Sequence, residues 1–219
     1  MQALVLQLRG CFHGTVSQVL RAPASAHTCL ASNKKSGDSE MSESSKTLAT
    51  TEETRRARVA VLQALAGIDT PPQEAVNVLT KLAASLCGAP FALVTLIDCE
   101  RLCFHATYGL NADSMDRASS FCSDATDASE FLEVADARAD PRFCNSSMVT
   151  GDLAIRFYAG VPLIVNGVAI GKLCILDRQP RQLTAEQREA LNDLALLTTV
   201  ILQARVDAFK TLSAVHSQF

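Results

Sequence analysis

The sequence predicts an α+β fold, in which helices cover one face of a central antiparallel sheet and loops cover the other. Two apolar runs flank Asn166-Gly167, a dipeptide typical of two-residue β-hairpins. Both faces of this hairpin are apolar, so both must be covered. Apolar residues at helical spacing on either side of the sheet region supply the helices. The loop-covered face leaves room for a ligand pocket.

Composition excludes several classes of protein. Of 219 residues, 48% are hydrophobic and 20% are charged, as in ordinary globular proteins. The formal net charge of -3 gives no electrostatic reason to expect nucleic acid as a partner. No apolar run approaches the roughly 18 residues needed to cross a bilayer, so we expect no membrane-spanning segment. The eight cysteines lack Cys-x-x-Cys spacing, which indicates reduced intracellular thiols rather than a zinc ribbon.

The N-terminal segment, residues 1–37, contains basic residues but no Asp or Glu. Its Ser-rich, amphipathic composition is typical of an organelle transit peptide. The alternatives are an unstructured extension, or sequence upstream of a start at Met41. We therefore predict a cytoplasmic protein, or a mitochondrial or other organellar one if the segment is a targeting sequence. Residues 1–50 are expected to be extension and linker, 51–205 the folded domain, and 206–219 a helical extension or tail.

Two helices are expected before the sheet. Thr50-x-x-Glu53 is a capping box that predicts the start of the first. Thr70-Pro71-Pro72-Gln73 predicts the start of the second, with proline in the first turn, and Gly88 predicts its end. The apolar positions that this second helix should bury are Val76, Leu79, Ala83 and Leu86.

The strands follow. The nearly continuous apolar run 91–97 predicts a strand covered on both faces, and a turn separates it from a second strand over 102–107. Residues 131–135 predict a short strand. Turn chemistry and sparse apolar periodicity over 136–153 predict a long functional loop.

A two-residue turn at Asn166-Gly167 would set the register of the hairpin, with Val165 opposite Val168. Arg156 then lies opposite Asp177, which predicts a cross-strand ion pair. The alternative is that Arg156 reaches an anionic ligand at the mouth of the pocket. The same register places Tyr158 opposite Ile175 and Ala159 opposite Cys174, puts Phe157 and Leu176 on one face, and puts Tyr158, Leu173 and Ile175 on the other.

The last helix is predicted to begin at the capping sequence Thr184-Ala185-Glu186-Gln187. Its apolar stripe continues past the point where one sheet could cover it, through Val206, Phe209, Leu212 and Val215. A helix of a second subunit would cover these positions. The alternative is that the tail frays or folds back. The stripe expected to pack within the domain comprises Leu191, Leu194, Thr198, Ile201 and Arg205.

Several segments, in order along the chain, carry a family resemblance. They are Leu65 to Pro72, Ser120-Phe121-Cys122, Val134 to Ala137 with Asp140 to Phe143, Arg156 to Leu163, and Gly171 to Asp177. Together these segments resemble the GAF domains of bacterial and lower-eukaryote signalling proteins, from about Arg55 to about Gln203. The resemblance implies a sheet of about six antiparallel strands, helices on one face, a small-molecule pocket on the other, and a role in sensing or regulatory dimerisation.

Specialised chemistries of this family fit poorly. Covalent bilin binding would place His directly after the cysteine, but Ser123 follows Cys122 and Asp124 comes next. The cyclic-nucleotide pattern and a phosphate-binding glycine cradle are not found. Haem needs an axial ligand, usually histidine. His105 is the one histidine inside the folded region away from its end, and on a strand it is more typical of an ordinary exposed or core histidine. Cys99 and Cys103 are spaced too loosely for zinc. We expect no cofactor and no metal.

The candidate ligand pocket combines aromatic residues with charged residues from the loop and the hairpin. The aromatic residues would line an apolar cavity or simply fill it. A lined cavity favours a small neutral or amphipathic ligand over a nucleotide. The predicted pocket residues are Phe121, Cys122, Asp136, Phe143, Arg156, Phe157 and Tyr158.

These observations predict a stand-alone sensory or regulatory module without catalysis of its own. It would bind a small molecule or a partner, form a homodimer through its terminal helices, and signal by association, with an effector protein as a further partner. One alternative is the free methionine sulfoxide reductase, which shares this fold and uses a thiolate nucleophile with a resolving cysteine; Cys103 and Cys122 are the candidate redox thiols. The other is a ligand-free dimerisation scaffold.

Overall fold

The computed structural model describes residues 40–66, 73–97, 101–110, 114–116, 121 and 131–216. The segment 1–37, Cys99 and the stretch 122–130 lie outside the described residues. Three predictions therefore stay untested: the transit peptide, the lack of a zinc site at Cys99 and Cys103, and every role given to Cys122. Within the described ranges, no helix is long and apolar enough to cross a bilayer.

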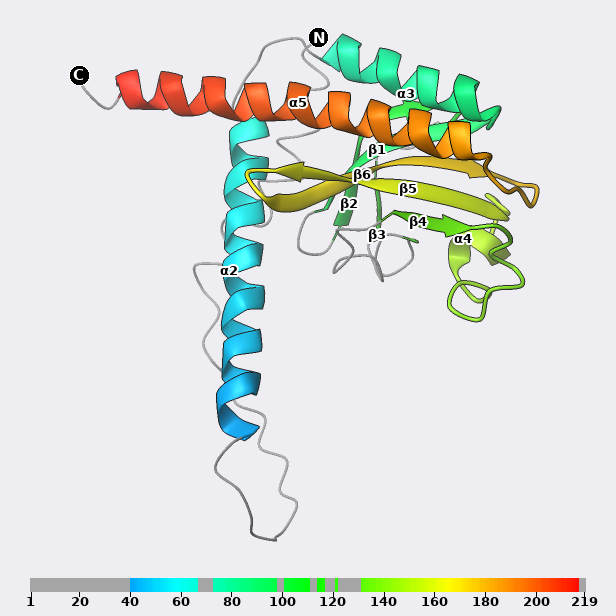
Figure 1. Cartoon of the computed structure of the whole chain (residues 1–219), viewed down its shortest axis with the longest axis horizontal. Coiled ribbons are helices and arrows are strands. Elements are labelled where there is room, and N and C mark those ends of the chain that lie inside the picture. The colour runs from blue at the N-terminus through cyan, green and yellow to red at the C-terminus, as the bar shows by residue number, and fades with distance from the viewer. Residues whose placement is uncertain are drawn as a thin grey trace, which may run out of the picture.

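Six antiparallel strands form one sheet, in the order β3-β2-β1-β6-β5-β4. The first three strands are neighbours in one half of the sheet and the last three in the other, and the two halves join where β6 pairs with β1 (Figure 1). This confirms the predicted α+β class. The strands are β1 (Phe91–Ile97), β2 (Arg101–Tyr108), β3 (Ser114–Asp116), β4 (Leu132–Val134), β5 (Phe157–Val165) and β6 (Val168–Asp177).

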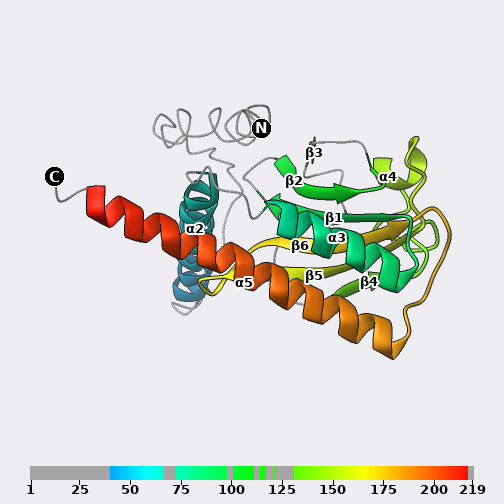
Figure 2. The same ribbon diagram turned by 90° about the horizontal axis from the view of Figure 1, so that it is seen from above.

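Helices α3 (Gln73–Cys87) and α5 (Ala185–His216) lie side by side across one face of the sheet (Figures 1 and 2). The C-terminal part of α2 (Glu40–Ala66) packs against α5 and β6. There the Nε of Arg58 donates a hydrogen bond to the carbonyl oxygen of Ala169 at 2.9 Å. The short helix α4 (Ser147–Thr150) lies on the other side of the sheet (Figure 1).

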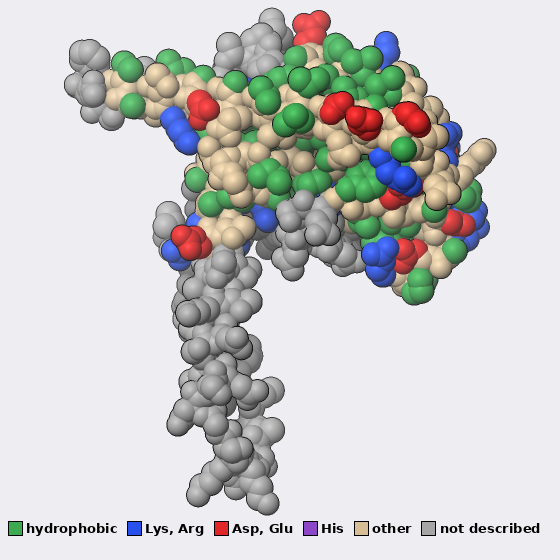
Figure 3. Space-filling model, viewed as in Figure 1, with side chains coloured by type: hydrophobic (Ala, Val, Ile, Leu, Met, Phe, Trp, Pro, Cys, Tyr) green, Lys and Arg blue, Asp and Glu red, His purple; other side chains and the backbone are tan. Residues whose placement is uncertain are grey.

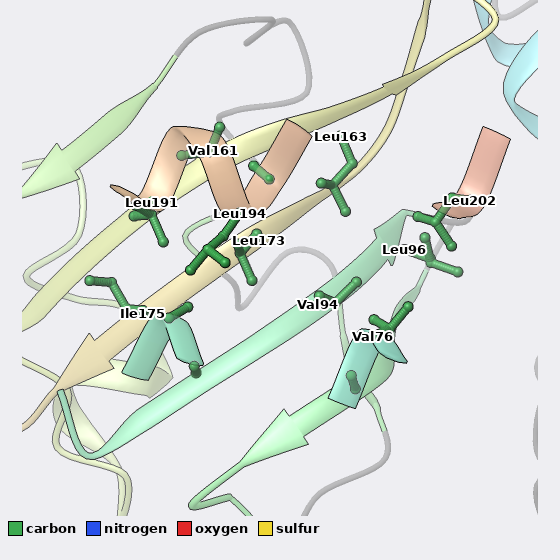
Figure 4. Close-up of a cluster of buried hydrophobic side chains, with 14 of the residues drawn as sticks. Val76, Val94, Leu96, Val161, Leu163, Leu173, Ile175, Leu191, Leu194 and Leu202 are labelled. Carbon is green, nitrogen blue, oxygen red and sulfur yellow. The ribbon is translucent and has the colours of Figure 1, made fainter. Parts of the chain in front are cut away.

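The larger hydrophobic core lies between the sheet and these helices (Figure 4). Alternate residues of each strand point toward it, as the two-residue period of a β-strand requires. We call this side of the sheet the helix-side face. The core residues labelled in Figure 4 are Val76, Val94, Leu96, Val161, Leu163, Leu173, Ile175, Leu191, Leu194 and Leu202.

Two helix termini form as the sequence predicts. At the end of α3, Gly88 has φ +60, its N–H bonds to the carbonyl of Ser85, and the N–H of Ala89 bonds to the carbonyl of Ala84. These two bonds define a Schellman motif. At the start of α5, the N–H of Gln187 donates to Oγ1 of Thr184 at 3.2 Å, and the N–H of Thr184 donates to Oε1 of Gln187 at 3.1 Å. The predicted capping box is therefore confirmed.

Two predictions about the helices are wrong. Helix α2 spans Glu40–Ala66, so Thr50-x-x-Glu53 lies inside it rather than at its start, and the polar stretch 40–50 is helical. This stretch contains Glu, Met, Lys, Leu and Ala, which are good helix formers. Its polar composition nevertheless favoured the prediction of a linker. Leu86 is exposed rather than buried. The buried stripe of α3 instead runs through Thr80, Ala84 and Cys87, which leaves Leu86 on the outer side.

The hairpin register also differs from prediction. Val165 pairs with Val168 and Ile164 with Ala169, as expected from the tight turn, but Leu163 pairs with Gly171. Ile170 is thus an extra residue in β6, a β-bulge that shifts all later pairs by one. Tyr158 therefore lies opposite Leu176, Ala159 opposite Ile175, and Phe157 opposite Asp177.

A one-residue shift exchanges the faces of a strand. Leu173 and Ile175, predicted to share a face with Tyr158, belong instead to the helix-side core with Phe157. Leu176, predicted to share a face with Phe157, packs with Tyr158. The edge strand β3 was not expected, because three residues are too few to produce a recognisable alternation.

Candidate ligand site on the loop-side face

The face of the sheet opposite α3 and α5 is covered by the segment that joins β4 to β5, and we call it the loop-side face. Buried side chains from this segment pack with alternate residues of β1, β5 and β6. They form a second hydrophobic cluster, separate from the helix-side core. Its buried members are Leu93, Ile97, Leu102, Phe121, Val134, Ala137, Phe143, Met148, Val149, Ile155, Tyr158, Cys174 and Leu176.

Three of the predicted aromatic residues meet in this cluster. The ring of Phe121 stacks on that of Tyr158 with centroids 5.1 Å apart, and it meets Phe143 edge-on at 5.0 Å. Offset-stacked and edge-to-face geometries are the arrangements that aromatic quadrupoles prefer. The hydroxyl of Tyr158 lies 3.3 Å from the sulfur of Cys174. The three rings therefore pack against one another on the loop-side face.

The fourth aromatic residue, Phe157, lies elsewhere. It is fully buried in the helix-side core, because it alternates with Tyr158 along β5. The inclusion of Phe157 in the loop-side pocket is therefore wrong. The sequence could have excluded it, since two adjacent strand residues cannot both face one pocket.

Arg156 and Asp136 form a two-point ion pair. The Nε of Arg156 donates to Oδ1 of Asp136 at 2.6 Å, and the Nη2 of Arg156 donates to Oδ2 of Asp136 at 2.5 Å. These hydrogen bonds hold the pKa of Asp136 below its ordinary value and raise that of Arg156. Both side chains are about a quarter exposed. Whether either contacts a ligand stays a prediction.

The predicted ion pair between Arg156 and Asp177 is thus wrong. Once the bulge moves Phe157 opposite Asp177, the contact between positions 156 and 177 is a backbone hydrogen bond from the N–H of Arg156 to the carbonyl of Asp177, at 2.8 Å. The carboxylate of Asp177 instead pairs with Arg181.

The loop between β4 and β5 is held by similar contacts. Arg142 makes two side-chain hydrogen bonds to Asp140, at 3.1 and 2.7 Å, and Asp140 also accepts from the N–H of Arg142. Ala137 donates its N–H to the carbonyl of Arg156 at 2.6 Å. Aspartate carboxylates commonly stabilise turns through hydrogen bonds of this kind.

Three of the four described thiols, Cys87, Cys103 and Cys174, are buried. Cys103 is 3% exposed and pairs across β1 with Leu96, so it faces the helix side. Cys174 lies on the loop-side face beside Tyr158. Burial raises the pKa of Cys87 to about 11, although the positive charge of Arg181 opposes this, so its thiol stays protonated at neutral pH. Cys144 is half-buried, and its sulfur lies 3.7 Å from the carbonyl of Pro141.

Sequence reasoning missed a buried lysine on this face. Lys172 lies near the middle of β6 and is 1% exposed, and its Nζ has no hydrogen-bond partner in the described part of the chain. A lysine inside an apolar strand that must be covered on both faces was a visible signal, because lysine is almost never fully buried unless paired.

The architecture is that of a class of small α+β domains found in solved structures. The GAF domain of the photoreceptor PixJ from Thermosynechococcus elongatus, in its blue-light absorbing form, superposes with a TM-score of 0.56 at 16% identity, covering 67% of this chain and 94% of that one. A GAF domain from a phosphoenolpyruvate-protein phosphotransferase of Coxiella burnetii gives 0.51 at 15% identity, covering 74% and 95%. At these identities the likeness shows the fold alone.

The family follows from the sequence match. The GAF domain model matches residues 71–202, and the chain belongs to the GAF domain family. This confirms the resemblance. The chain is also 36% identical over 140 residues to a cyclic di-GMP phosphodiesterase of Pseudomonas aeruginosa. The match covers 64% of this chain but only 24% of that enzyme.

Proposed function

We propose that this protein is a regulatory GAF module that binds a small molecule on the loop-side face and signals by association, without catalysis of its own. The observation that carries the proposal is the outer surface of α3 and α5, which we call the outer helix face. It exposes large apolar side chains although the sheet already covers the inner sides of both helices. Its exposed apolar residues are Val78, Leu82, Leu86, Leu196, Leu197 and Val200.

The outer helix face has the composition of an interface core. From 194 to 206, the only charged residue of α5 is Arg205, and its side chain is buried. Figure 3 shows hydrophobic side chains gathered over α3 and α5. Depletion of charge at the centre of an apolar patch distinguishes protein interfaces from ordinary surface. A second copy of this chain presents the same largely apolar face, so a two-fold dimer would bury both at once.

The proposed lack of catalysis is supported by the burial of three of the four described thiols, Cys87, Cys103 and Cys174. Cys103, one of the two candidate redox thiols, faces the helix side, where it is almost fully buried. A thiol that attacks a substrate must be reachable and readily ionised. The alternative, a sulfoxide reductase, depends on Cys122. Turnover of free methionine sulfoxide with dithiothreitol that is lost in Cys122→Ser would contradict the non-enzyme proposal.

Sedimentation velocity of the full chain tests association. We expect a dimer for the unmodified protein and a monomer for Val200→Glu, because a charge at the centre of an apolar interface is left unpaired. Asn192→Glu, at an exposed and already polar position of the same helix, is the matched control and should stay dimeric. A monomeric unmodified protein, or a Val200→Glu variant that stays dimeric, would contradict association through this face.

A further inference from the structure

The buried lysine of β6 is held at the middle of the sheet. Its main chain pairs with Thr95 of β1 on one side and with Pro162 of β5 on the other. The Lys172 N–H donates to Oγ1 of Thr95 at 3.3 Å, and the same hydroxyl lies 3.3 Å from the Lys172 carbonyl oxygen. The hydroxyl of Thr95 is therefore engaged by the backbone, and the ammonium is left without a partner among the described residues.

Strand alternation assigns this side chain to a face. Leu173 and Ile175 lie in the helix-side core, whereas Cys174 and Leu176 lie in the loop-side cluster. Lys172 precedes Cys174 by two residues, so it shares the loop-side face and begins about 7 Å further along the strand. The same face carries the hydroxyl of Tyr158, which contacts Cys174.

An ammonium taken out of water needs an anion or several acceptors to offset the loss of hydration. The carboxylates that anchor the loops around the site are already engaged by arginines. Asp136 pairs with Arg156 and Asp140 with Arg142, while Asp177 pairs with Arg181. Glu133 pairs with Arg188 at 2.7 Å. None of these acids pairs with Lys172, so within the described part of the chain the compensating negative charge would have to come from a ligand.

The surroundings restrict the chemistry of that ligand. One unpaired ammonium balances one negative charge, whereas a phosphate would call for more than one cation. The same face of the sheet carries the hydrophobic and aromatic side chains of the loop-side cluster, beginning with Cys174 two positions along β6. Such a site fits a molecule with a single carboxylate and an apolar body.

We propose that Lys172 binds the carboxylate of a small amphipathic monoanion on the loop-side face. This assignment rests on the sensory function proposed above and specifies the class of ligand. The ammonium forms a charge-assisted hydrogen bond with the carboxylate, while the apolar body packs toward the aromatic residues of the cluster. The hydroxyls of Thr95 and Tyr158 are further polar groups on this face.

Thermal unfolding and titration calorimetry of the full chain test the assignment, with sodium hexanoate as the probe. We expect hexanoate to raise the unfolding midpoint in a concentration-dependent way, and hexanamide, its neutral analogue, to have no such effect. In Lys172→Met the affinity for hexanoate should fall about tenfold to a hundredfold, the value of a hydrogen bond to a charged group. Lys172→Arg, which restores a cation, should recover part of it, and Lys81→Met on the exposed side of α3 should bind normally.

The unfolding midpoint of the ligand-free variant gives a second and independent readout. Because Met has similar length and no charge, Lys172→Met should unfold at the same temperature as the unmodified protein or higher. A clear loss of stability would mean that the ammonium is already paired within the protein, and would overturn the proposal. So would equal stabilisation by hexanoate and hexanamide, stabilisation by inorganic phosphate alone, or no response to hexanoate. None of these results bears on whether the chain dimerises, which sedimentation decides separately.

Discussion

Tyr158 lies over Gly160, two positions further along β5, and this contact depends on the missing side chain. A Cβ built at position 160 would stand 2.3 Å from the Tyr158 hydroxyl oxygen and 2.8 Å from the ring carbon that bears it. The ring cannot retreat freely, because Phe121 stacks on it. At this single position, glycine determines how the aromatic residues of the loop-side face are arranged.

We therefore expect Gly160→Ala to destabilise the fold by about 1–3 kcal/mol, the usual cost of forcing extra volume into a packed cluster. Chemical denaturation measures the change. In a Tyr158→Val background the same substitution should cost much less, because the ring that it displaces is gone. An equal cost in both backgrounds would show that the strain comes from the backbone instead.

His105 is the bulged residue of β2, since Val94 pairs with Ala106 and Thr95 with Phe104. Burial and, to a smaller extent, the positive charge of Arg205 together lower the pKa of His105 to about 4. An unfolded histidine binds a proton below about pH 6.5, whereas the folded one stays neutral until about pH 4. Acid therefore favours the unfolded chain across this window.

The expected result is a fall in unfolding free energy as the pH drops from 6.5 to 4, with an upper bound of about 3 kcal/mol from this one group. His105→Gln, which cannot gain the charge, should show a shallower slope in the same interval. Urea denaturation at a series of pH values measures both slopes. Parallel curves for the two proteins would contradict the assigned pKa. The carboxyls with lowered pKa, such as Asp136, act on both proteins alike.

At the scale of elements, sequence rules succeeded where the cause is local. The capping box at Thr184, the glycine end of α3 and the apolar strand β1 were all predicted, because each depends on a few neighbouring residues. The bulge at Ile170 was not. A two-residue turn fixes only the pairs beside it. The available signal was Gly171, directly after the bulge, because glycine inside a strand often marks one.

That one slip explains most of the errors at the candidate site. It moved Leu173 and Ile175 to the helix side and separated Arg156 from Asp177. The true partner of Arg156, Asp136, lies 20 positions away and follows from how the loop folds back. The burial of Lys172 likewise depends on tertiary packing, although its place in an apolar strand was a visible warning.

The capping box provides a test at this scale. Thr184→Ala removes the hydroxyl that accepts from the Gln187 N–H, and we expect a loss of about 0.5–2 kcal/mol of stability. Thr211→Ala, at an exposed position within α5 where the hydroxyl bonds only to the carbonyl of Asp207, is the matched control and should be nearly neutral. Thermal unfolding compares the two. A loss as large in the control would mean that the measurement reports helix propensity rather than capping.

At the scale of the whole molecule, one sheet separates the proposed ligand site from the proposed dimer surface. On β1, Thr95 pairs with Lys172 of β6. Its neighbours along the strand, Val94 and Leu96, pack in the helix-side core beneath α3 and α5. A ligand on one face and a second subunit on the other therefore act on the same strands. If the two events are coupled, each must change the affinity of the other by the same factor.

The most direct test of this account is sedimentation equilibrium of the full chain with and without sodium hexanoate. We expect hexanoate to shift the dimer dissociation constant of the unmodified protein and to leave that of Lys172→Met unchanged, because the effect requires the buried ammonium. Hexanamide should shift neither. A dimer dissociation constant that does not respond to hexanoate in the unmodified protein would contradict ligand-controlled association and would favour a ligand-free dimerisation scaffold.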